Sequence, residues 1–124
     1  MAATNLWAAW IGIFLGLASG TVQGLFFHRE DWLGGYDAWP RRLMRLGHIS
    51  FFGIAFLNLA YANTVALLGG DADVPAASML LVAGAITMPL VCYLAAWKKP
   101  LRHLFPVPVL SLLGAVAALI GGLA

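Results

Sequence analysis

The chain has 124 residues, of which 62% are hydrophobic and 10% charged, and its formal net charge is +2. A soluble domain carries about a quarter charged residues, so this composition excludes an ordinary soluble fold. The charged residues fall in three short windows, and the four segments between them each approach the ~20 apolar residues that cross a bilayer. We predict an all-α integral membrane four-helix bundle, a single transmembrane domain over residues 1–124, with helices over about 5–28, 38–68, 74–97 and 104–123.

The first predicted helix, over about 5–28, carries glycine at every fourth position, as in a glycine zipper. Small residues at this spacing let a second helix approach closely in lipid. The predicted helix over 104–123 repeats the pattern more weakly. We expect both stripes to pack within the bundle; the alternative is that one faces a neighbouring protein. The residues concerned are Gly12, Gly16, Gly20, Gly24, Gly114, Ala118 and Gly122.

The second predicted helix, over about 38–68, is longer than a bilayer requires and is polar at its first end. Asp37 is expected to cap its start and to pair with Arg41, four residues later. Asn58 is expected near the middle of the membrane, where an amide commonly makes a helix-to-helix hydrogen bond. The run Arg45-Leu46-Gly47-His48, followed by Phe51, Phe52 and Asn58, resembles a stretch of small membrane subunits of respiratory chains.

The third and fourth predicted helices cover about 74–97 and 104–123, and the content of the predicted spans argues against two kinds of site. The single cysteine, Cys92, lies inside a predicted span, so an intramolecular disulfide and a multi-cysteine metal site are excluded. No aspartate or glutamate lies in any predicted span, which argues against a small proton-coupled exporter, because such a transporter needs a titratable carboxylate within the membrane.

The seven basic residues lie only between the first and second uncharged apolar segments or between the third and fourth. Positively charged loops remain in the cytoplasm, so both termini are predicted to be non-cytoplasmic. A bacterial inner membrane or a plasma membrane is the expected location of this multi-pass protein. The same rule explains the positive charge, so we expect no nucleic acid partner.

This topology brings the polar side chains of the predicted helix ends together at the cytoplasmic face. Intramembrane polar groups are functional candidates by default. A b-type haem, held by His48 and either His28 or His103, is one interpretation, with an arginine near the propionates. A quinone or lipid pocket is another, and ordinary anchoring of helix ends is the simplest. The candidate cofactor-binding residues are His48, His28, His103, Arg45, Arg41 and Gln23.

No nucleophile with a base, phosphate-binding glycine loop or metal-ligand pattern is recognisable in the sequence. We therefore expect no catalytic activity of the chain's own. The prediction is an accessory or scaffold subunit of a larger membrane complex of respiratory or electron-transfer type, with the lipid bilayer and other membrane subunits, or a second copy, as partners. The alternative is a membrane electron carrier that binds haem b or quinone.

Overall fold

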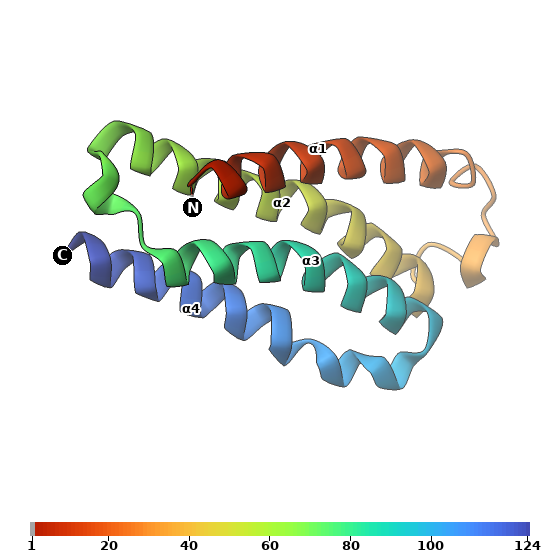
Figure 1. Ribbon diagram of the computed structural model, residues 1–124. Helices are drawn as coiled ribbons and strands as arrows, with labels where there is room; N and C mark the ends of the chain where they lie inside the picture. The colour runs from red at the N-terminus through yellow and green to blue at the C-terminus, as the bar shows by residue number, and fades with distance from the viewer. Residues whose placement is uncertain (1) are drawn as a thin grey trace.

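The computed structural model describes residues 2–124, and its regular structure is entirely helical (Figure 1). Four α-helices follow one another: α1 (Ala2–Gly24), α2 (Trp39–Leu68), α3 (Pro75–Trp97) and α4 (Pro106–Leu123). Three short 3₁₀ helices lie in the connections: η1 (Trp32–Gly34), η2 (Gly70–Ala72) and η3 (Lys99–Leu104). Within the described residues, four helical segments are long and apolar enough to cross a membrane, which indicates a membrane protein.

Local sequence accounts for most of the helix ends. Pro40, Pro75 and Pro106 each lie in the first turn of a helix, where the missing N–H would have no partner in any case. Helix α2 ends at Leu68 and is followed by Gly69, whose φ of 90° is a conformation that glycine adopts without steric cost. The position before α2 is taken by Ala38, which makes no side-chain cap, so the expected capping by Asp37 is not found.

Helix α1 begins and ends earlier than the sequence indicates. It ends at Gly24 rather than near residue 28, and the following residues form turns closed by hydrogen bonds such as Phe26 N to Gln23 O at 3.0 Å. The Phe27 and Arg29 carbonyls in these turns accept hydrogen bonds from the Arg41 guanidinium. These hydrogen bonds attach the turns after α1 to the start of α2.

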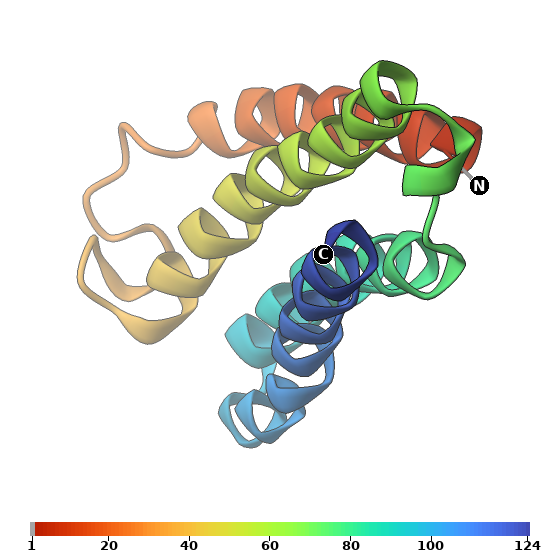
Figure 2. The same ribbon diagram turned by 90° about the vertical axis from the view of Figure 1, so that its left-hand side faces the viewer.

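The helices form two antiparallel hairpins, α1 with α2 and α3 with α4 (Figure 2). Helix α2 also packs along α3, whereas α1 and α3 meet over a shorter stretch and α4 lies mainly against α3. The arrangement is therefore more open than a closed four-helix bundle. Its main apolar core joins α2, α3 and α4 and consists of Tyr61, Ala77, Leu81 and Ala115.

Small residues allow close contacts within both hairpins. A Cβ at Gly12 would lie 3.0 Å from Cβ of Ala55, and a Cβ at Gly16 would lie 2.7 Å from the Phe52 ring. Gly24 has open space around it. In the second hairpin Gly114 approaches Leu80 and Ala118 packs against the core, while Gly122 lies against Val74 at the start of α3.

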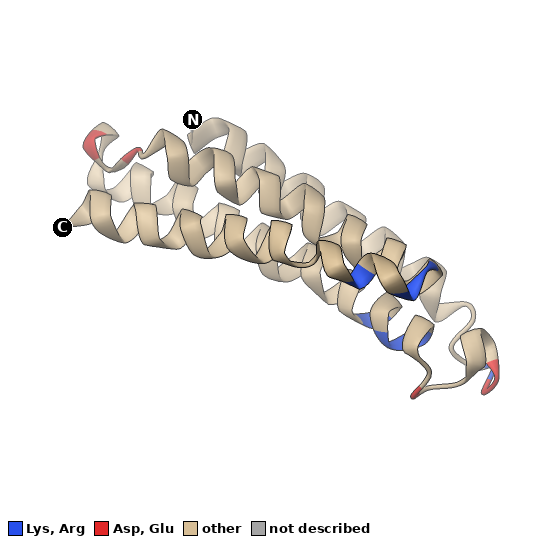
Figure 3. Cartoon of the chain, turned by 90° about the horizontal axis from the view of Figure 1, so that it is seen from below, with Lys and Arg blue, Asp and Glu red and all other residues tan. Residues whose placement is uncertain are grey.

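Charge is confined to the two ends of the molecule (Figure 3). The lysines and arginines gather at the end that holds η1 and η3, which we call the basic end, whereas both termini lie at the opposite end. At that opposite end Tyr61 joins α2 to the start of α3. Its hydroxyl accepts a hydrogen bond from the Val74 N–H at 2.8 Å and donates one to the Asp73 carboxylate.

Candidate functional site

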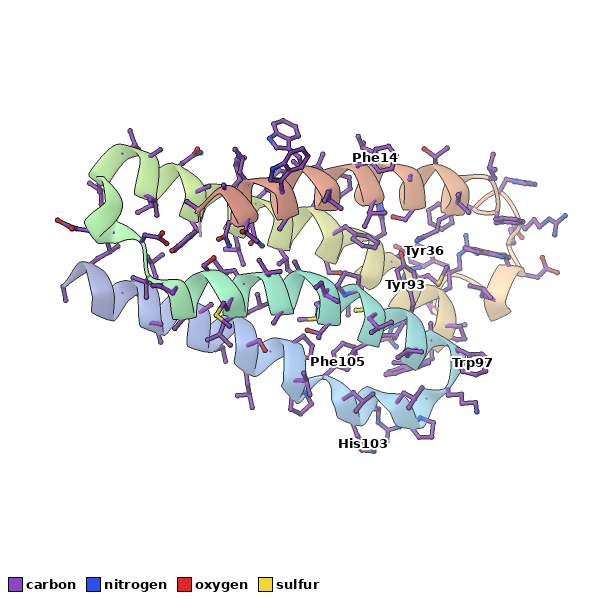
Figure 4. All side chains as sticks on the ribbon, in the orientation of Figure 1. Phe14, Tyr36, Tyr93, Trp97, His103 and Phe105 are labelled. Atoms are coloured by element: carbon purple, nitrogen blue, oxygen red, sulfur yellow. The ribbon has the colours of Figure 1, made fainter. Side chains whose placement is uncertain are left out.

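The three histidines reach the basic end in different environments. His28 lies exposed in the turns after α1, and His103 lies exposed in η3. Figure 4 shows His103 pointing away from the helices. His48 is half-buried on α2, where its imidazole packs against α1. The structure therefore does not direct these histidines toward a common centre.

The His48 ring is occupied by contacts within the first hairpin. Its Nδ1 lies 3.2 Å from the Ser19 hydroxyl, and its ring meets Phe52 edge-on at 5.4 Å between centroids. Gly20 lies directly beneath it, because a Cβ there would approach the ring to 2.5 Å. The glycine thus provides the space in which a polar ring fits between α1 and α2.

Arg41 and Arg45 bind the loop between α1 and α2. The Arg41 side chain is 5% exposed and donates to the carbonyls of Phe27 at 3.0 Å and Arg29 at 3.1 Å. Its guanidinium also lies over the Trp32 ring, 5.6 Å from the centroid, rather than against Asp37. Arg45 donates to the Tyr36 carbonyl at 2.8 Å and lies over the ring of the same residue. Both guanidinium groups therefore have structural partners.

Gln23 and Tyr93 join α1 to α3 just inside the basic end. Gln23 is 2% exposed, and its Nε2 donates to the Tyr93 hydroxyl at 2.8 Å. Its Oε1 is buried and has no hydrogen-bond partner among residues 2–124. An unpaired amide oxygen in an apolar environment costs free energy, of the order of 1–3 kcal/mol. This oxygen is therefore the candidate contact for a group that is not part of the chain.

A groove between α1 and α3, floored by α2, begins beside these two residues. Its larger part is a cavity of about 500 Å³ with an almost wholly apolar lining, including Trp7, Ile11 and Ile86. Its smaller part, about 340 Å³, is lined by Ser19, Gln23 and Tyr93 among others. Among the candidate cofactor-binding residues, only Gln23 lines this groove.

A second polar cluster lies toward the opposite end and joins three helices. Asn5 on α1 donates from Nδ2 to Asn58 Oδ1 on α2 at 2.7 Å and accepts from the Ser78 hydroxyl on α3. Asn58 Nδ2 also donates to the Ile54 carbonyl at 3.0 Å. The three side chains are fully buried. Asn58 therefore makes a hydrogen bond between helices. Nothing in the linear sequence indicates that Asn5 and Ser78 would be its neighbours.

These arrangements limit the chemistry of the chain. No group of three or more His, Cys, Asp or Glu side chains that could hold a metal ion occurs in the part of the chain that the structure describes. The polar groups instead hold helices and a loop, and two buried side-chain atoms of residues 2–124, Gln23 Oε1 and Arg41 Nε, have no hydrogen-bond partner. Comparison of the chain with protein-family models, curated proteins and solved structures finds no match.

Proposed function

We propose that this protein is an accessory subunit of a larger membrane assembly, bound through the outer face of α1. Large aromatic side chains cover this face: Trp7 is 71%, Trp10 59% and Phe14 69% exposed. Figure 4 shows Phe14 pointing away from the other helices. Tryptophan and phenylalanine are enriched in the cores of protein interfaces. This exposed aromatic face is the observation on which the proposal depends.

The distribution of polar groups supports the same function. Buried side chains such as Asn58 and Arg41 bond within the chain, and the parts outside the apolar helices are short. These features suit a molecule that acts by binding a partner through its surface. The run Arg45-Leu46-Gly47-His48, followed by Phe51, Phe52 and Asn58, is the sequence feature behind the proposal that the host complex transfers electrons.

We also propose an orientation and a location. Lysine and arginine gather at one end of the molecule, and positively charged ends remain in the cytoplasm. Both termini would then be non-cytoplasmic, in a bacterial inner membrane or a plasma membrane.

The haem alternative has less support from the geometry. Axial ligation by two histidines requires two imidazoles that face each other across one plane. His48 is packed on Gly20 and Phe52, whereas His28 and His103 are exposed. A cofactor-free, colourless preparation is therefore expected from the chain expressed alone.

Purification in mild detergent tests the subunit proposal. A tagged wild-type chain is expected to retain a partner in fixed stoichiometry, and replacing Trp7, Trp10 and Phe14 by alanine is expected to release it. The matched control replaces three exposed residues of α4, Leu110, Leu113 and Ile120, by alanine and should retain the partner. The mass of the complex distinguishes another subunit from a second copy of the chain. A wild-type chain that purifies alone would refute the proposal.

A further inference from the structure

The groove between α1 and α3 is one continuous feature. Its two cavities, about 500 Å³ and 340 Å³, share Leu15 and Phe51 in their linings. On α1 the lining runs from Thr4 to Gln23, which corresponds to about 28 Å at 1.5 Å per residue. These volumes fall in the range of ligand pockets, about 300–1,000 Å³. Exposed Trp7 and Ile86 form its rims, so the groove opens toward lipid.

The groove is more polar at the basic end than at the other. Thr4 is the single hydroxyl in the lining of the larger cavity, while Ser19, Gln23 and Tyr93 gather in the smaller one at the basic end. The Oε1 atom of Gln23 is an acceptor without a partner, and the amide itself is 2% exposed. A ligand that satisfies this atom must bring an O–H or N–H donor to the basic end of the groove.

The head of such a ligand should be neutral. No lysine or arginine lines either cavity, and the nearby Arg41 and Arg45 guanidinium groups already donate to carbonyls. A phosphate would therefore be desolvated here without a cationic partner, which is costly. An aromatic head suits the site better, because the Phe51 and Tyr93 rings stand 6.2 Å apart, inclined by 38°, beside the polar end.

We propose that the α1–α3 groove binds an isoprenoid quinol, with its phenolic hydroxyl donating to Gln23 Oε1 and its apolar tail lying along α1 toward Trp7. The Tyr93 hydroxyl is a positioning group, since it accepts from Gln23 Nε2 at 2.8 Å and so holds the amide in place. This site stands whether or not the chain is an accessory subunit.

Binding is measured on the chain in phosphatidylcholine nanodiscs, with decylubiquinol as the probe and empty nanodiscs as the background. We expect saturable binding of one quinol per chain above the background. Decylubiquinone, which lacks the hydroxyl donor, should bind roughly tenfold more weakly, the loss that one hydrogen bond in an apolar site causes. Equal or tighter binding of the quinone would overturn the proposal.

Single substitutions test the polar end and the tail end of the site independently. Gln23→Leu should weaken quinol binding roughly tenfold and abolish the preference for quinol over quinone. The matched control is Thr21→Val, at the same depth of α1 but exposed and outside the groove, which should leave binding unchanged. Should Gln23→Leu not fold, Ala85→Phe, which fills the tail end of the groove, should weaken decylubiquinol binding but not that of a quinol with a methyl tail.

Three results would contradict the proposal. The first is binding that does not saturate above empty nanodiscs. The second is an anionic phospholipid, phosphatidylglycerol, that competes with the probe and binds more tightly than it, which would assign the groove to a lipid headgroup. The third is a crosslink between two copies of the chain through cysteines placed at Ile11 and Ile86, which would assign it to a helix of a second copy.

Discussion

Arg41 shows how a cationic side chain is buried in this protein without an acidic partner. Its guanidinium donates to backbone carbonyls of Phe27 and Arg29 and lies over the Phe27 and Trp32 rings. Carbonyl oxygens in the turns after α1 thus receive donors from a side chain rather than from a helix. The side chain fixes the path of the loop between α1 and α2 rather than a ligand.

Replacing Arg41 by methionine is expected to destabilise the chain by about 2–3 kcal/mol, because hydrogen bonds to a charged group contribute about 1.5–3 kcal/mol and their loss leaves carbonyls unsatisfied. Arg42→Met, at an exposed position next to it, is the control and should change stability by less than about 0.5 kcal/mol. Thermal unfolding in detergent measures both. Equal melting temperatures for the two variants would contradict this role.

Asn58 is the centre of the cluster that joins α1, α2 and α3. Asn58→Leu should cost about 1–2 kcal/mol, since it removes the Asn58 acceptor of the buried Asn5 amide, which then bonds only to Ser78. The double variant with Asn5→Leu should cost less than the sum of the two single changes. Asn63→Leu, exposed on the same helix, is the control. Additive losses in unfolding experiments would show that the two amides do not interact.

At the scale of the element, α1 is defined by the glycines that face α2. A side chain at Gly16 would collide with the Phe52 ring, and one at Gly20 with the His48 ring. Substitutions here therefore disturb the fold of the chain itself, and they are poor tests of partner binding. The aromatic side chains on the outer face of α1 provide the better test.

Gly16→Leu is expected to destabilise the first hairpin by about 1–3 kcal/mol, the usual cost of overpacking a filled interface. Gly24→Leu should be nearly neutral, because nothing lies within 4 Å of a Cβ at that position. Circular dichroism during heating in detergent compares the two variants. A stable Gly16→Leu protein would mean that α1 does not pack on α2 through this face.

The elements differ in how far the sequence predicts them. The four apolar segments are recognisable because charge is absent from each of them. The end of α1 is not, because no proline directly follows Gly24, and the contact of Arg41 with the Arg29 carbonyl, 12 residues earlier, appears only in the folded chain. The candidate site is predicted only in Gln23: its unpaired oxygen and its contact with Tyr93, 70 residues away, exist only once α1 and α3 lie side by side.

At the scale of the whole molecule, both termini lie opposite the basic end (Figure 3). A periplasmic reporter enzyme fused after Ala124 is expected to be active, because the positively charged end remains in the cytoplasm. The same reporter fused after Lys99 should be inactive and serves as the control. The reverse pattern would show that the orientation is inverted.

The tryptophans also mark two levels of the molecule. Asn5 and Ser78 stand at one level through their hydrogen bond, so Trp7 and Trp10 on α1 lie level with residues near 81 on α3. Exposed Trp97 follows on α3, roughly 24 Å further along at 1.5 Å per residue. Tryptophan prefers the headgroup region on both sides of a bilayer, so the proposed partner would contact Trp7 and Trp10 at that level.

That spacing is shorter than the usual ~30 Å hydrocarbon layer, but the apolar helices extend beyond it. Helix α2 has 30 residues and is therefore about 45 Å long at 1.5 Å per residue. A helix longer than the hydrocarbon layer is accommodated by tilting or by extending into the headgroup region. Because α2 packs along both α1 and α3, these helices should tilt together, and the molecule should cross the membrane at an angle to the bilayer normal.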